Sequence, residues 1–258
     1  MNILVIAAHP DDAEGIAGGT AALYRKNGHR VKFLSVTNGD TGHFAMGGAQ
    51  LARRRKKEAE NSASVIGAEC TVFDIHNNEL EPNLFYRKML VEEIRKFKTD
   101  IIITHRPYDY HPDHRYTGIL VQDSSYMVTV PFFCPDVDPL DKNPVFLFSY
   151  DRFKSPNPFK PDVVVTIDEV IEKKVDALLK MESQFIEGGA LGSADRAPKD
   201  EAAREKRRHA VRDSFKRRFA AVADNCRGSD MAVSVSEWKD RSEIVTRAKG
   251  IPLLTTQG

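Results

Sequence analysis

The sequence predicts an α/β protein in which helices cover both faces of a mostly parallel sheet. Short apolar runs alternate along the chain with longer segments of helical periodicity, which is typical of such sheets. The runs ILVIAA (3–8) and IIIT (101–104) are almost continuously apolar, as expected for strands buried on both faces. Because crossovers between parallel strands are right-handed, we expect a Rossmann-like three-layer sandwich.

The individual elements follow from the same patterning. Apolar runs predict strands near residues 2–8, 31–37, 70–75, 100–105, 145–150 and 162–167. Amphipathic segments predict helices near residues 17–27, 48–66, 83–97, 114–127 and 168–186. Two stretches break the alternation. Residues 131–161 are rich in proline and aromatic residues, which indicates a long ordered loop near the functional edge of the sheet, and residues 187–202 are typical of a flexible connector.

Length and charge limit the classes of protein to consider. We expect residues 1–186 to form one domain, and residues 187–258 to be an extension packed on it or at a subunit contact. The net charge of +1 gives no global argument for nucleic acid or an anionic membrane. No apolar run approaches the roughly 18–20 residues of a membrane span, and we expect no signal peptide before the first strand. Cys70, Cys134 and Cys226 lie far apart without CxxC spacing, so we expect reduced thiols in a cytoplasmic protein.

Polar loops follow the first and the fourth predicted strands. The turn HPDD, residues 9–12, stands where a dinucleotide-binding protein would carry glycines. The second loop contains HPDH, residues 111–114, just after the strand that ends near residue 105. Ligands of open parallel sheets bind outside the carboxyl ends of the strands. We therefore expect the two loops to face each other across one crevice.

The residue types in these loops point to metal-dependent hydrolysis. Two imidazoles and one carboxylate with an open coordination position form a catalytic zinc site. Such an ion lowers the pKa of a bound water to about 7, and a carboxylate that is not a ligand can accept the proton of that water. HPDD offers a histidine and one aspartate as ligands and a second aspartate as base. A non-ligating histidine on the facing loop can stabilise the tetrahedral intermediate.

Simpler explanations exist for each motif alone. Asp11 and Asp12 could cap the following helix, and HPDH could be a proline turn. The joint occurrence of both motifs at strand ends favours a site over these readings. The same donor set also suits non-haem iron(II). We expect the remaining histidines to be structural or surface residues: His29, His43, His76, His105 and His209.

With these residues identified, the chain resembles the PIG-L/LmbE-like family of zinc-dependent N-deacetylases. The resemblance covers about residues 1–186. It rests on AHPDDAE followed by GGT, TNGDTG at 37–42, LARRRKKEA at 51–59, HPDH at 111–114, and DVVVTI with KKVDALLKMESQ between 162 and 184. It implies removal of the acetyl group from an N-acetylglucosamine-type sugar conjugate. The motif reads HPDDAE where many members have HPDDE, which leaves the metal-binding residues intact.

The resemblance also implies a role for each site residue. It makes His9, Asp12 and His114 the ligands of one zinc ion per chain, with Fe²⁺ able to take its place. Asp11 would be the general base that activates the metal-bound water.

Three further residues receive roles from the same resemblance. His111 would polarise or protonate the oxyanion and the leaving amine, and Asp113 would orient a histidine. Arg55 would contact the substrate, although Arg53 and Arg54 leave that assignment ambiguous.

Rival functions remain at this point. One keeps the zinc chemistry and changes the substrate to another small N-acyl compound or a thiol conjugate. Another is a nucleic-acid-binding module that uses the basic segment 204–218. Against it, Val211, Phe215, Phe219 and Val222 recur at helical spacing, which indicates a helix packed on the body or on a neighbouring subunit. The partner we expect is a small amino-sugar conjugate, without nucleic acid or a membrane span, and a homo-oligomer is compatible with the sequence.

Overall fold

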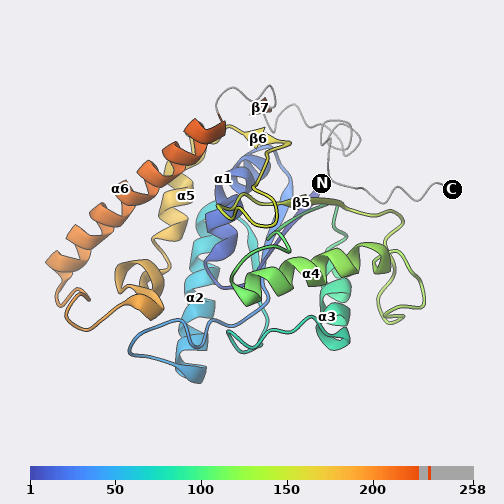
Figure 1. Cartoon of the computed structure of the whole chain (residues 1–258), viewed down its shortest axis with the longest axis horizontal. Coiled ribbons are helices and arrows are strands. Elements are labelled where there is room, and N and C mark those ends of the chain that lie inside the picture. Colours follow the sequence, from blue (N-terminus) through green and yellow to red (C-terminus); the bar gives the residue numbers. More distant parts are fainter. Residues whose placement is uncertain (227–231, 234–258) are drawn as a thin grey trace.

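A five-stranded parallel sheet forms the centre of the protein (Figure 1). The structure is a computed structural model, and it describes residues 1–226 and 232–233. The strands are β1 (Asn2–Ala7), β2 (Arg30–Ser35), β3 (Glu69–Val72), β4 (Ile101–Thr104) and β5 (Val145–Phe148). Their order is β3-β2-β1-β4-β5, and every neighbouring pair is parallel. The predicted Rossmann-like architecture is confirmed.

Helices cover both faces of this sheet. The first four helices are α1 (Asp12–Lys26), α2 (Gly48–Ile66), α3 (Leu84–Lys96) and α4 (Pro112–Met127), and α5 (Ile171–Leu178) follows later in the chain. Alternate side chains of β1 divide between two cores. Ile3 and Val5 pack with α1, α2 and α5, whereas Leu4 and Ile6 pack with α3 and α4. All four side chains are fully buried, so β1 is the central strand that the apolar run predicts.

The strand order places the loops after β1 and β4 side by side. The chain passes from β1 to β2 and β3 on one side, then returns to pair β4 with the other edge of β1. The crossovers therefore diverge between β1 and β4, which is the switch point where open α/β sheets bind ligands. The last residues in register there are Ile6 and Thr104, so both loops begin at the same level.

The predicted strand at 162–167 lies outside the main sheet. The structure has a short strand β6 (Val164–Val165) that pairs with β7 (Ala232–Val233). The apolar residues of this segment pack on the helix layer instead: a Cβ at Gly19 of α1 would lie 2.7 Å from a side-chain carbon of Ile167. An apolar alternation that serves helix packing has the same period as one that serves a sheet, which is why the sequence misplaced this segment.

Helix boundaries also differ from the prediction in two places. α1 begins at Asp12, well before residue 17. The predicted helix 168–186 is divided into a 3₁₀ turn (Asp168–Val170), α5, and a π-helical turn (Glu182–Ile186).

A single buried arginine organises the chain after α4. Arg95 of α3 donates hydrogen bonds to five backbone carbonyls, those of Met127, Val128, Val130, Cys134 and Val137. Its side chain is almost completely buried. These contacts order the proline-rich segment in which the sequence predicts an ordered loop.

The stretch 187–202 is held against α2 by side-chain hydrogen bonds at its first residue, Glu187. Arg54 donates two hydrogen bonds to Glu187, at 2.8 and 2.9 Å, and His43 contacts the same carboxylate. A 3₁₀ turn (Gly189–Leu191) follows. The prediction of a flexible connector did not anticipate these contacts, because they link residues more than a hundred positions apart.

The last described helix, α6 (Glu201–Cys226), runs beside α5 (Figure 1). Val211, Phe215 and Phe219 pack against Val175 and Leu178 of α5. The predicted apolar stripe therefore packs on the body of the protein. The domain boundary at residue 186 stays a prediction, and residues 227–231 and 234–258 of the predicted extension lie outside the described residues.

Two sequence-based expectations about the whole chain can be compared with the described part. Within it, no helix is both long and apolar enough to cross a membrane. Cys70 and Cys134 are free thiols, while the side chain of Cys226 lies outside the described residues.

Candidate active site

The HPDD turn connects β1 to α1 without using its carboxylates as helix caps. The backbone N–H groups of Asp11 and Asp12 donate to the carbonyl of His9, at 2.9 and 3.2 Å, which closes the turn. Asp11 occupies the N-cap position of α1, but its side chain makes no capping hydrogen bond. Asp12 instead accepts the backbone N–H of His9 at 2.8 Å. The capping explanation for these two carboxylates is therefore not supported.

The HPDH loop forms the first turn of α4. His111 is the N-cap residue, and its Nδ1 accepts the backbone N–H of Asp113 at 3.2 Å. Pro112 occupies the first helical position, where its missing N–H costs nothing. Gly118 allows α4 to lie against the end of β4, because a Cβ there would lie 2.6 Å from the carbonyl oxygen of His105.

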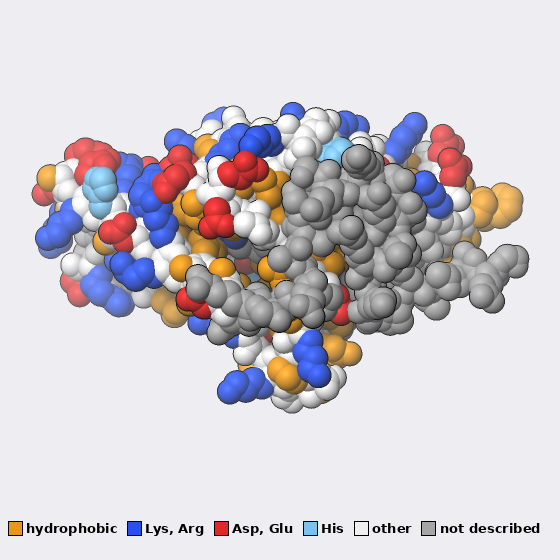
Figure 2. Space-filling model, turned by 90° about the horizontal axis from the view of Figure 1, so that it is seen from above, with side chains coloured by type: hydrophobic (Ala, Val, Ile, Leu, Met, Phe, Trp, Pro, Cys, Tyr) orange, Lys and Arg blue, Asp and Glu red, His pale blue; other side chains and the backbone are white. Residues whose placement is uncertain are grey.

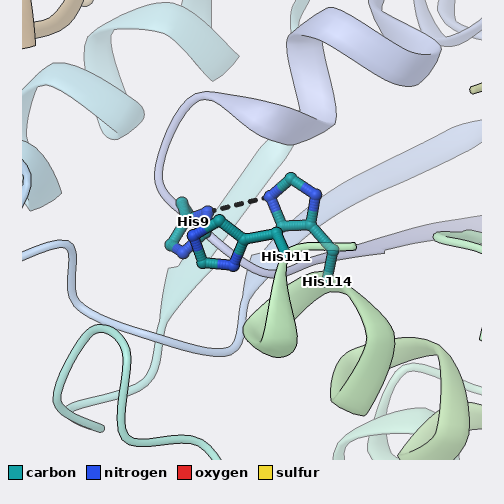
Figure 3. A group of neighbouring side chains, drawn as sticks. All are labelled: His9, His111 and His114. Carbon is teal, nitrogen blue, oxygen red and sulfur yellow. Dashed lines mark hydrogen bonds between the residues drawn. The ribbon is translucent and has the colours of Figure 1, made fainter. Parts of the chain in front are cut away.

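Donor atoms of both loops converge on one point (Figure 3). His9 Nδ1 lies 3.1 Å from His114 Nε2 and 3.1 Å from Asp12 Oδ2. His114 Nε2 lies 3.3 Å from Asp12 Oδ2. Ligands at about 2.0–2.1 Å in tetrahedral zinc sites are separated from one another by roughly 3.3 Å. The three atoms therefore have the spacing of neighbouring ligands around one ion.

The outer nitrogens of both histidines contact carboxylates. Asp113 Oδ2 lies 3.1 Å from His9 Nε2 and also accepts the backbone N–H of Asn78 at 2.7 Å. Asp109 Oδ2 lies 3.0 Å from His114 Nδ1. Carboxylates in this position fix the ring orientation and the tautomer of metal-binding histidines. Asp109 and Asn78 could not be identified from the sequence. The only signal for Asp109 is its place in the same loop as HPDH.

Two more histidines surround this centre. His105 stacks on His114 with ring centroids 4.2 Å apart, and its Nε2 accepts the backbone N–H of Ala8 at 3.1 Å. That hydrogen bond occupies the lone pair that could face a metal, which agrees with a structural role. The donor atoms of His9, His111 and His114 also lie within 4.8 Å of one another. The donor atoms of Asp12, His105 and His114 form a second group within the same limit.

The charges around the site favour a cation. Burial disfavours a charged imidazole, but hydrogen bonds with Asp113 and Asp12 outweigh it and raise the pKa of His9 to about 9. At His114 the effect of burial is outweighed by the charge of Asp12 and the hydrogen bond to Asp109, which raise its pKa to about 11. Burial alone would raise the pKa of Asp12, yet the neighbouring histidines hold it well below its usual range. In the metal-free protein, protons therefore lie between Asp12 and the two histidines, where a metal ion would be bound.

Asp11 differs from the other carboxylates of the site. It lines the cavity beside Asp12, and among the described residues its side chain has no hydrogen-bond partner. Burial, together with the negative charge of Asp12, raises the pKa of Asp11 to about 6. A carboxylate with a pKa close to neutrality is suited to accept and return a proton.

Arg55 lies behind Asp11 rather than in the open cavity. Its Nη1 is 4.0 Å from Asp11 Oδ2, and its side chain donates to the carbonyl of Gly42 and to Gln184. Arg55 is 2% exposed, so the surrounding residues enclose its side chain. Arg54 is paired with Glu58 and Glu187, and Arg53 is exposed. Of the three arginines, Arg55 is therefore the one that faces the site, while its contact with a substrate stays a prediction.

The candidate metal site opens into a cavity of about 790 Å³. One end contains Asp11, Asp12, His111 and His114. The cavity continues along residues 149–153 to a wall formed by α5 and α6. This volume falls within the range of about 300–1,000 Å³ that encloses organic ligands in proteins.

Known proteins with the same features were found by sequence and by structure. The family model for PIG-L, GlcNAc-PI de-N-acetylase, matches residues 4–124. Diacetylchitobiose deacetylase of Thermococcus kodakarensis is 32% identical over 193 residues, which cover 72% of this chain and 70% of that protein. 4-Oxalmesaconate hydratase of Pseudomonas putida is 25% identical over 191 residues, covering 70% and 73% of the two chains.

A solved structure agrees with the sequence matches. N,N'-diacetylchitobiose deacetylase from Pyrococcus horikoshii superposes with a TM-score of 0.63 at 29% identity, covering 71% of this chain and 70% of that chain. The parallel sheet and the matched region that holds both loops are thus features of one group of enzymes. The chain belongs to the PIG-L/LmbE-like family of hydrolytic N-deacetylases.

Proposed function

We propose that the protein uses one zinc ion per chain to remove the N-acetyl group from an N-acetylglucosamine-type sugar conjugate. The convergence of His9 Nδ1, Asp12 Oδ2 and His114 Nε2 within 3.1–3.3 Å carries this proposal. The family and the activities named for the two diacetylchitobiose deacetylases support the choice of substrate class.

The residues present fit zinc. Two imidazoles and one carboxylate are its ligands in catalytic sites, and the second carboxylates, Asp109 and Asp113, orient the imidazoles. His9, Asp12 and His114 would hold the ion, which supplies a Lewis acid for the acetyl carbonyl and an acidified water as nucleophile. Iron(II) accepts the same donor set, so metal analysis has to identify the native ion.

Asp11 acts as the base in this proposal. Its carboxylate takes a proton from the water whose oxygen attacks the acetyl carbon. The C–N bond then breaks, the nitrogen takes up a proton, and the products are acetate and a free amine. The raised pKa of Asp11, about 6, allows the same group to accept the proton and to return it.

His111 stabilises the negative charge that develops on the acetyl oxygen. Its Nδ1 accepts the N–H of Asp113, so a neutral ring carries its proton on Nε2 and can donate it. Burial keeps the pKa of His111 below its usual value and favours the neutral ring. Such a donor aimed at the developing oxyanion accelerates acyl transfer.

Arg55 positions and tunes Asp11 in this scheme. Its positive charge, 4.0 Å from the carboxylate, opposes the rise in pKa that burial and Asp12 cause. Arg55 thereby keeps Asp11 ionised, and so able to accept a proton, near neutral pH. We retain a direct contact with the sugar as a second role for this residue.

The rival functions receive less support. Half of the basic residues in segment 204–218 are neutralised, since Arg204, Arg208, Arg212 and Lys216 all form ion pairs. Charges of both signs are mixed on the flank that α6 forms, at the left of Figure 2. That flank is not the uniformly positive surface that binds nucleic acid.

The decisive experiment combines metal analysis with product analysis. Purified protein should contain about one zinc per chain, and it should release acetate and amine in equal amounts from diacetylchitobiose or N-acetylglucosamine glycosides. Stoichiometric iron with oxygen consumption would contradict the proposal. So would the hydration of an unsaturated dicarboxylic acid without any acetate release, the outcome expected of a hydratase.

A further inference from the structure

The cavity extends beyond the metal centre to a wall that α5 and α6 build. Phe185, Phe215 and Phe219 form an aromatic cluster there, with ring centroids 4.9 Å apart for Phe185 and Phe215 and 5.9 Å apart for Phe215 and Phe219. All three residues line the cavity. Because one end of the cavity holds the reacting acetamido group, this wall faces the part of the substrate that does not react.

A buried lysine lies against the same wall. Lys174 of α5 is 5% exposed, and its Nζ donates to the carbonyl of Gly15 at 2.8 Å. The Nζ also lies 4.0 Å from the ring centroid of Phe219. Small residues of α1 make room for this side chain, since a Cβ at Gly18 would already touch Lys174 at 3.4 Å.

Lys174 has donors to spare and no acidic partner. An ammonium group carries three N–H donors, and a single backbone carbonyl accepts one of them. Within the described part of the chain no carboxylate pairs with Lys174. Burial and then the positive charge of Arg218 lower the pKa of Lys174 to about 7. An anion beside it would offset both effects and restore its charge.

Arg218 of α6 is a second uncompensated cation at this end of the cavity. It lines the cavity, yet it forms no ion pair or hydrogen bond with any described residue. Arg208 and Arg212, about three and two turns earlier on the same helix, are paired with acidic residues: Arg208 with Glu182, and Arg212 with Glu172 and Asp176. Acidic residues thus neutralise the part of α6 that contains Arg208 and Arg212. Arg218, at the cavity, has no such partner among the described residues.

We propose that the α5–α6 end of the cavity is a subsite for a substrate aglycone that is both apolar and negatively charged. Phe215 and Phe219 would pack against the apolar part, while Lys174 and Arg218 would bind its carboxylate or phosphate. This inference rests on the proposed deacetylase function, because it describes how that site selects its substrate.

Matched substrates test the subsite directly. We would measure kcat/KM for acetate release from phenyl N-acetylglucosaminide and from its 4-carboxyphenyl and 4-phosphonooxyphenyl analogues. One charged hydrogen bond corresponds to roughly a tenfold preference, so at least one charged glycoside should exceed the neutral one by about that factor. The better of the two identifies the anion. Equal values for all three glycosides would overturn the proposal.

Substitutions on α6 locate the effect. Arg218→Gln should lower the preference for the charged glycoside about tenfold, and Phe219→Ala should lower kcat/KM for all three aryl glycosides relative to the methyl glycoside. Arg217→Gln changes an exposed neighbour that does not line the cavity, so it should leave the preference unchanged. An equal response of the Arg217 and Arg218 variants would overturn the assignment.

A binding measurement separates this proposal from the proposed function. Calorimetry with the zinc-loaded protein and 4-carboxyphenyl glucosaminide, which has no acetyl group to lose, reports on the subsite alone. We expect it to bind about tenfold more tightly than phenyl glucosaminide, and Lys174→Met to abolish the difference. Failure of acetate release together with this preference would refute the deacetylase and keep the subsite. Absence of the preference would refute the subsite.

Discussion

The two ends of the cavity treat their charged groups in opposite ways. At the metal end each proposed histidine ligand has a carboxylate on its outer nitrogen, Asp113 for His9 and Asp109 for His114. At the α5–α6 end Lys174 has one carbonyl as partner, and Arg218 has none among the described residues. Saturated contacts hold groups in place before a ligand arrives, whereas unsatisfied charges remain available to it. In our proposals, the end with the two loops is therefore organised for chemistry and the α5–α6 end for recognition.

Removal of a metal ligand should produce the largest effect at the organised end. His114→Ala should reduce zinc content from about one per chain to a trace, and kcat/KM should fall at least about 10³-fold because the acidified water is lost. Plasma emission spectrometry and an acetate assay measure both quantities. His209→Ala, an exposed histidine of α6, is the control. A His114 variant that keeps its zinc would show that the two loops do not share an ion.

Loss of the base should separate chemistry from metal binding. Asp11→Asn should retain about one zinc per chain and lose roughly 10²–10⁴-fold in kcat, the usual contribution of a general base. The asparagine keeps the shape of the side chain and cannot accept the proton. Normal turnover by this variant, measured as acetate release at saturating substrate, would remove Asp11 from the mechanism.

The carboxylates behind the histidines should have a smaller effect. Asp109→Asn and Asp113→Asn should each weaken zinc affinity by about 10–100-fold, because the imidazoles lose the partners that orient them. Competition with a chromophoric chelator measures this affinity. Asp123→Asn, which changes a surface ion pair of the same helix with Arg87, supplies the matched control. An affinity equal to that of the control would show that neither carboxylate supports the proposed metal site.

The pH dependence of zinc binding tests the same end of the cavity without any substitution. With pKa values raised to about 9 and 11, His9 and His114 hold protons at neutral pH in the metal-free protein. Zinc must displace these protons, so its affinity should rise with pH between 6 and 8, by about tenfold per unit for each proton released. Calorimetry in two buffers of different ionisation enthalpy counts the protons. An affinity that stays constant over this range would contradict the proposed ligands.

The proximity of the HPDD and HPDH loops could be predicted from the sequence, because it follows from local motifs and from the strand order. HPDD and HPDH each place their polar residues within four positions, and both follow apolar runs that could only be buried strands. The rule that ligands bind at the switch point of such sheets then brings the two loops together without any knowledge of contacts.

The remaining features depend on contacts between distant segments. The local pattern does not show that Asp109 contacts His114 or that Arg55 lies behind Asp11. It does not show either that Lys174 lies between α1 and the ring of Phe219. The segment 162–167 fails for a related reason, since its apolar period is equally compatible with a sheet and with the helix layer on which it packs. Tertiary packing decides these cases, and sequence periodicity does not report it.

The most direct test of the central claim is a zinc titration of metal-free protein with acetate release as the readout. Diacetylchitobiose is one suitable substrate, and the activity is followed as zinc is added in steps. One site built from His9, Asp12 and His114 predicts that activity rises linearly and stops rising at one equivalent per chain. Activity in the absence of any metal, or a rise that continues well beyond one equivalent, would contradict it.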